Sequence, residues 1–230
     1  MKIAIVAALS KEIQYYLNTI PNLVRHTTAH VSFYEGDFAG HELVIAQSGI
    51  GKVNAAIATT IVAQEQPDLL INTGSAGELD PKLNVGDVVV ATETRHHDVD
   101  ATAFGMVLGQ VEGLPASYPC DETYIAQLTK TVQEQTDSHV TTGLIVSGDS
   151  FIASQEKVHW LQANFPGAQC VEMEAASIGQ VAYQFGIPYL VVRAISDTAS
   201  QDADVLFETF IDAVGEKSAQ TTLAFIEAIK

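Results

Sequence analysis

Two carboxylates stand one residue apart in the segment VEMEA, where Glu172 and Glu174 interrupt an otherwise apolar stretch. If residues 171–173 end a buried strand, its period of two points both side chains to the same side. Two like charges in a half-buried place repel each other and lose hydration, so the pair costs stability. We therefore interpret both glutamates as groups that hold a ligand.

Two further acids lie close to the ends of predicted strands. Asp197 stands just past the strand predicted over residues 189–195, which also carries Arg193 facing inward. Glu12 comes from the loop after the first predicted strand. Open α/β sheets bind ligands at the carboxyl ends of their strands, so we expect these acids to meet in one crevice. A purely structural ion pair at Arg193 and Asp197 is the alternative.

Small and aromatic residues follow two other predicted strands, in TGSAGEL (73–79) and SGDSFI (147–152). The small residues suit a close approach of ligand to backbone, and a plain β-turn is the alternative. Phe151 could stack on a planar base, or it could belong to the core. Agreement among separate strand ends favours a binding site.

A group of potential metal ligands occurs in RHHDVD, at His96, His97, Asp98 and Asp100. Neighbouring side chains on an extended segment point apart, so the spacing favours structural or interface hydrogen bonding over a metal site.

The sequence motifs that bind nucleotide cofactors are incomplete in this chain. GIGKVN (49–54) lacks the third glycine of a dinucleotide fold and the Ser or Thr of a P-loop.

Composition restricts the possible partners. The chain has 230 residues, with 28 acidic and 11 basic side chains and a net charge of -17. Nucleic acids and anionic membranes bind to basic patches, so we expect neither of them as a partner. A small neutral or cationic ligand agrees better with the negative charge of the chain. Cys120 and Cys170 show no zinc-like spacing, which favours reduced thiols in the cytoplasm. No apolar run approaches the roughly 18 residues of a membrane span.

Apolar runs alternate with helical stretches, which is typical of a sheet covered on both faces. We predict strands over residues 2–7, 31–35, 43–46, 69–73, 87–92, 140–146, 169–173 and 189–195. We predict helices over residues 10–19, 53–64, 121–136, 155–164, 174–185 and 205–229. The segment from about 95 to 118 has little periodicity, and a loop of this length is usually functional or lies at an interface.

The motifs SGIGKVNAA, NTGSAG, HHDVDATAFG, GLIVSGDSFI, VEMEA and VVRAISD run in order along the whole chain. In motifs, order and spacing the chain resembles the 5'-methylthioadenosine/S-adenosylhomocysteine nucleosidases of the nucleoside phosphorylase superfamily. The resemblance implies an α/β fold, with residues 1–230 as one three-layer α/β/α sandwich around a mixed central sheet. It also implies a homodimer without a cofactor, which hydrolyses the bond between adenine and a thio-modified ribose.

The resemblance also implies roles for individual residues. Glu12 would activate water, Asp197 would protonate adenine N7, and Glu174 would hold ribose hydroxyls. The expected binding residues are Ser75, Ala76, Gly77, Phe151, Ile152, Glu172, Met173, Arg193, Ser196 and Phe207. Among them, Met173 would pack on the sugar, the Ile152 backbone would read the adenine edge, Phe207 would cap the base and Ser196 would orient Asp197. A loop of the second subunit containing Phe104 would cover the alkylthio tail.

Several positions depart from the family pattern: Leu9, Ser10, Lys11, Glu78, Met106, Leu108 and Glu112. None of these departures changes a catalytic residue. What they leave open is the preference among 5' substituents of the substrate. Three other functions also stay open. A purine nucleoside phosphorylase would need cationic donors for phosphate, and few arginines are present. A futalosine-type nucleosidase shares the same scaffold. A non-catalytic adenosine sensor would have no need for the three acids.

Overall fold

The computed structural model describes residues 1–199 and 202–229. Its strands are β1 (Lys2–Ala7), β2 (Val24–Thr28), β3 (Val31–Phe38), β4 (His41–Gln47), β5 (Leu69–Glu78), β6 (Val88–His96), β7 (Tyr118–Pro119), β8 (Val140–Ser147), β9 (Ala168–Glu172) and β10 (Tyr189–Asp197). Its helices are α1 (Ser10–Thr19), α2 (Lys52–Ala63), α3 (Glu122–Gln135), α4 (Gln155–Asn164), α5 (Ala175–Phe185) and α6 (Ala203–Ala228), with a 3-10 turn at Thr102–Phe104.

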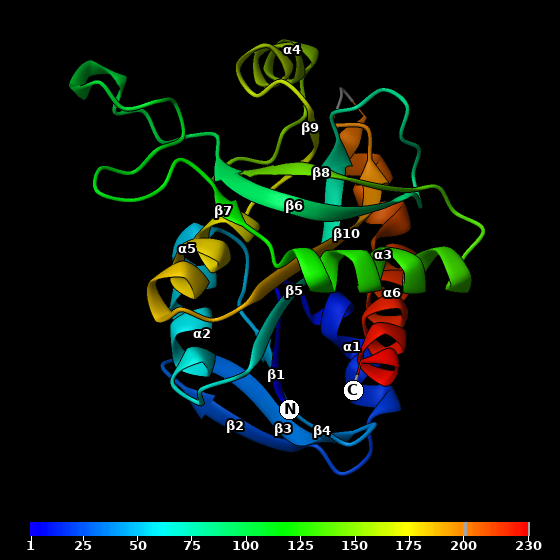
Figure 1. Ribbon diagram of the computed structural model, residues 1–230. Coiled ribbons are helices and arrows are strands. Elements are labelled where there is room, and N and C mark those ends of the chain that lie inside the picture. The colour runs from blue at the N-terminus through cyan, green and yellow to red at the C-terminus, as the bar shows by residue number, and fades with distance from the viewer. Residues whose placement is uncertain (200–201, 230) are drawn as a thin grey trace.

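The strands form one mixed sheet in the order β10-β6-β8-β9-β5-β1-β4-β3-β2, with β7 beside β6. Strand β5 also pairs with β10, so part of the sheet closes on itself as a ring of β5, β10, β6, β8 and β9. The rest of the sheet continues as an open sheet from β5 through β1 and β4 to the hairpin strands (Figure 1). The prediction of a mixed central sheet is therefore confirmed.

Helices cover both sides of this sheet. Helices α1, α3 and α6 pack together on one side, and α2 packs with α5 on the other (Figure 1). The loop between β6 and β7, which carries the 3-10 turn, extends away from the body of the molecule. Within the described part of the chain, no helix is long and apolar enough to cross a membrane.

Local signals explain several helix starts. Asp121 accepts hydrogen bonds from the backbone N–H groups of Thr123 and Tyr124, and Ser154 accepts one from Lys157. Both are N-cap residues that satisfy donors otherwise left free at a helix start. The first helix is capped differently, because the Glu12 carboxylate reaches back to the N–H of Leu9.

Sequence-based prediction missed two strands and misplaced several strand ends, among them those of β3, which continues to Phe38, and β6, which continues to His96. Strand β2 is exposed along its whole length, so it lacks an apolar alternation, and β7 has only two residues. Strand β5 continues to Glu78 and β10 to Asp197, so the segments predicted to follow these strands belong to them. Strand β9 ends at Glu172, which places Glu174 at the N-cap of α5.

Candidate active site

A cavity of about 440 Å³ lies at the carboxyl ends of β5, β9 and β10. Twelve of the predicted site residues line it: Glu12, Ser75, Ala76, Gly77, Phe151, Ile152, Glu172, Met173, Glu174, Ser196, Asp197 and Phe207. Among the described residues that line the cavity there is no lysine or arginine. The structure therefore brings the separate acids together in one place.

Glu12 is held by four hydrogen bonds from three neighbours. Its Oε2 accepts from the N–H groups of Ala8 and Leu9, each at 3.0 Å. Its Oε1 accepts from the N–H and the hydroxyl of Ser75, also at 3.0 Å. A Cβ at Gly74 would stand 2.7 Å from this Oε1, so only glycine leaves room for the carboxylate. The residues that follow β1 and Ser75 of β5 thus fix the Glu12 carboxyl group at the cavity wall.

Asp197 occupies a different wall, beside a β-bulge. The register between β10 and β5 shifts at Ser196, and bulges of this kind redirect side chains. Ser196 Oγ donates to Asp197 Oδ2 at 2.8 Å, and the N–H of Ala199 donates to Oδ1 at 2.8 Å. Burial raises the pKa of Asp197, and these two hydrogen bonds oppose the rise. The carboxyl group is therefore easier to protonate than an exposed aspartate.

Glu174 lines the cavity from the start of α5. Its Oε1 accepts a hydrogen bond from the N–H of Gly51 at 2.8 Å, and only 7% of the residue is exposed. Burial, followed by repulsion from Glu172, raises the pKa of Glu174. The two glutamates of VEMEA thus lie together as expected, although a helix start rather than a strand positions the second one.

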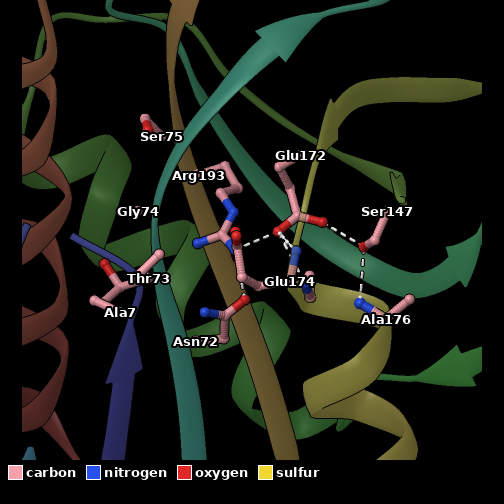
Figure 2. A network of polar contacts seen from close by, with 12 residues as sticks. Ala7, Asn72, Thr73, Gly74, Ser75, Ser147, Glu172, Glu174, Ala176 and Arg193 are labelled. Carbon is pink, nitrogen blue, oxygen red and sulfur yellow. Dashed lines mark hydrogen bonds and ion pairs between the residues drawn. The ribbon is translucent and has the colours of Figure 1, made fainter. Parts of the chain in front are cut away.

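Glu172 holds a buried polar network together (Figure 2). Its Oε2 accepts hydrogen bonds from Arg193 Nη2 at 2.6 Å and from the N–H groups of Glu174 and Ala175. Its other oxygen accepts from the hydroxyl of Ser147, which in turn accepts from the N–H of Ala176 at 2.8 Å. Glu172 therefore caps α5 and neutralises a buried cation at the same time.

Arg193 lies behind the cavity wall rather than on it. Its side chain is 2% exposed, and Nη2 also donates to Asn72 Oδ1 at 2.7 Å. Burial opposes its positive charge, but the surrounding carboxylates raise the pKa of Arg193 above its ordinary value. The structure thus pairs Arg193 with Glu172, and the proposed structural pair with Asp197 is not formed.

Replacing Glu172 by glutamine is expected to lower the free energy of unfolding by about 3 kcal/mol or more, because the buried Arg193 then loses the carboxylate with which it is directly paired. Chemical denaturation monitored by circular dichroism measures the change. The matched control is Glu134→Gln, which removes the exposed partner of Lys130 and is expected to change little. Equal, small losses in both variants would contradict a stabilising role for the Glu172 contact.

Two aromatic rings that line the cavity contact each other. Phe151 and Phe207 meet edge to face, with ring centroids 5.8 Å apart. Phe151 is 47% exposed, so it is not a core residue and its ring is free to contact a ligand. Phe104 is 80% exposed on the projecting loop and lies outside the cavity of its own chain.

Sequence reasoning missed seven residues that line the cavity: Ala8, Leu9, Ile50, Ser150, Val171, Asp204 and Glu208. Asp204, Phe207 and Glu208 share one face of α6 through their spacing of three and four, which was a usable signal. It also missed Asn72 and Ser147, whose polar side chains point from buried strands into the network around Glu172.

The residues of RHHDVD do not form a metal centre. Within residues 1–199 and 202–229, no group of three or more His, Cys, Asp or Glu side chains is arranged to hold a metal ion. His96 Nε2 lies 3.0 Å from Gln180 Oε1, and Asp98 pairs with Lys52. Hydrogen bonding is therefore the role that this segment has in the described structure.

A mixed sheet between helices, with an acid-lined cavity at its strand ends, defines an α/β enzyme with the nucleoside phosphorylase fold. The chain belongs to the phosphorylase superfamily, whose family model matches residues 2–229.

Known relatives cover nearly the whole chain. The 5'-methylthioadenosine/S-adenosylhomocysteine nucleosidase of Staphylococcus aureus strain MRSA252 is 45% identical over 228 residues, which cover 99% of this chain and 100% of the relative. The nucleosidase of the same name from Neisseria meningitidis, solved with methylthio-immucillin-A, superimposes with a TM-score of 0.97 at 41% identity and covers 99% of each chain. Futalosine hydrolase of Helicobacter pylori matches with a TM-score of 0.95 at 30% identity, over 100% of this chain and 98% of its own.

Proposed function

We propose that this enzyme hydrolyses the N-glycosidic bond of 5'-methylthioadenosine and S-adenosylhomocysteine, releasing adenine and the thio-ribose. The observation that carries the proposal is the convergence of Glu12, Glu174 and Asp197 on one cavity whose described lining contains no cationic side chain. Similarity over the full length to nucleosidases of that name supports the same substrates.

The charges that develop during the reaction fit this cavity. When the bond between C1' and N9 breaks, positive charge appears on the sugar and negative charge on adenine, as in glycoside hydrolysis. Asp197 donates its proton to N7 and so neutralises the leaving base. The oxygen of water bonds to C1', and Glu12 takes the proton that water loses. Fixed carboxylates near the sugar stabilise the cation-like transition state without having to reorganise.

The remaining cavity residues bind the two halves of the substrate. Glu174 accepts hydrogen bonds from ribose hydroxyls, and Met173 packs against the sugar. Phe151 and Phe207 hold the planar base, and the backbone of Ile152 reads its edge. The small residues of β5 that line the cavity, Ser75, Ala76 and Gly77, leave the space that the nucleoside occupies.

The protein acts as a cytoplasmic homodimer in this proposal. Large apolar side chains are exposed on and just before α2, at Ile50, Val53 and Ile57, and such a face is suited to burial against a second copy. The projecting loop with Phe104 then covers the partner's cavity and contacts the alkylthio tail.

An assay of adenine release tests the proposed function. Purified protein is incubated with 5'-methylthioadenosine, S-adenosylhomocysteine or futalosine, with and without inorganic phosphate. We expect release of adenine from the first two without phosphate. Products that form only with phosphate would identify a phosphorylase, and preference for futalosine would identify the related hydrolase. Binding without any release would identify a sensor.

A further inference from the structure

Three segments meet beside Glu174 in a closed set of hydrogen bonds. Lys52 Nζ donates to Asp98 Oδ1 at 2.5 Å, and the N–H of Lys52 donates to Asp149 Oδ1 at 2.7 Å. The N–H of Asp149 donates to Asp98 Oδ2 at 2.9 Å. Each of the three residues is thus bonded to the other two. We call this set of Lys52, Asp98 and Asp149 the Lys52 ring.

The Lys52 ring joins parts of the chain that are distant in sequence. Lys52 begins α2, Asp98 follows β6 and Asp149 follows β8. The side chains of Lys52 and Asp98 are only 18% and 28% exposed. Although burial acts to raise the pKa of Asp98, the hydrogen bonds from Lys52 and from the N–H of Asp149 lower it. The contact between the side chains of Lys52 and Asp98 is therefore partly shielded from water, although Asp98 and Asp149 lie at the protein surface.

The Lys52 ring adjoins the group that holds Glu174. Gly51 directly precedes Lys52, and its N–H donates to Glu174 Oε1 at 2.8 Å. Gly51 has a φ of +95°, and a Cβ there would lie 3.0 Å from Asp149 Oδ1. The Lys52 ring therefore restricts the backbone of Gly51 on one side, and on the other side the Gly51 N–H points to Glu174.

We propose that Lys52, Asp98 and Asp149 are positioning residues that fix the Gly51 N–H, and through it orient the Glu174 carboxylate toward the ribose hydroxyls. This inference rests on the proposed function. It assigns a role to Asp98 of the segment RHHDVD, which the reaction itself does not use. Small displacements of a group that binds substrate are enough to slow a reaction substantially.

The test compares substrates that differ only in the sugar hydroxyls. Lys52→Met keeps most of the apolar stem of the lysine, and Asp98→Asn keeps the shape of the aspartate. Steady-state kinetics are measured on 5'-methylthioadenosine and on analogues lacking the 2'- or the 3'-hydroxyl. The variant Glu174→Gln identifies the hydroxyl that Glu174 holds, since the analogue without that hydroxyl loses its sensitivity to the substitution.

We expect both ring variants to lower kcat/KM for 5'-methylthioadenosine by about 10- to 100-fold. On the analogue without the identified hydroxyl, the loss is expected to shrink almost to nothing. A merely structural ion pair would produce equal losses on every substrate, and that result, or no loss at all, would overturn the proposal. Because Asp98→Asn is nearly isosteric, it supplies the answer if Lys52→Met does not fold.

The matched control is Lys2→Met. Lys2 is also a partly buried lysine between carboxylates, at 2.9 Å from Glu42 and 3.3 Å from Glu65, but it lies at the opposite end of β1 from Glu12. We expect it to leave the kinetics on all three substrates unchanged. The wild-type protein in the same assay separates the positioning role of the Lys52 ring from the proposed function. Absence of adenine release by the wild-type protein would overturn the proposed function itself.

Discussion

Replacing Asp197 by asparagine is expected to lower kcat by about 10³-fold or more, while binding of 5'-methylthioadenosine remains measurable. Asparagine preserves the size of the side chain but has no acidic proton to give to adenine N7. An exposed aspartate with a pKa of about 3.9 is protonated in only ~0.1% of molecules at pH 7, a cost of about 4 kcal/mol. Burial reduces this cost by raising the pKa of Asp197.

The measurements for this variant are single-turnover kinetics and calorimetric binding. Since the protonated form of Asp197 is the active one, wild-type turnover is expected to fall as pH rises through the pKa of this group. The control is Asp212→Asn, which makes the same change at a residue whose side chain is 73% exposed. Turnover near the wild-type rate in Asp197→Asn would remove Asp197 from the role of general acid.

Replacing Glu12 by glutamine is expected to lower kcat by on the order of 100-fold or more, because an amide cannot take the proton from water. Glutamine has nearly the same shape, but its single oxygen can accept from only one donor set, either the N–H groups of Ala8 and Leu9 or the N–H of Ser75, and its NH2 faces the other. We therefore expect some loss of stability, together with a larger change in kcat than in KM. Stopped assays of adenine release, with thermal unfolding as a check on folding, measure both effects.

Glu216→Gln on α6 is the control, since Glu216 bonds only to Gln220 among its described side-chain contacts. If Glu12→Gln lowers the affinity for substrate but keeps the maximal rate, Glu12 binds the nucleoside and another group activates water.

Prediction from sequence succeeded where the signal is local. The bounds of α1, α4 and β1 agree with those expected, because capping residues and apolar runs mark their ends. Strand β2 could not be predicted, because an exposed edge strand needs no apolar pattern. It is stabilised by its pairing with β3, which is a tertiary feature.

The candidate site, too, could be predicted only where the sequence signal is local. Strand ends with acidic or small residues indicated Glu12, Glu174 and Asp197, and the topology then brought them together. Asn72 stands in the motif NTGSAG, but its role could not be predicted, because one polar residue on a buried strand is informative only once its partner Arg193 is known. The spacing of Asp204 and Glu208 places them on one face of α6 together with Phe207, but only the packing of the helix shows that this face meets the cavity.

Strand β5 belongs both to the closed ring and to the open sheet, with partners β1, β9 and β10. The walls that carry Glu12, Glu172 and Asp197 are therefore all anchored to the same ten residues. We therefore expect that neither the closed ring nor the open sheet unfolds while the active site keeps its geometry. Loss of activity on heating should then coincide with cooperative unfolding of the protein.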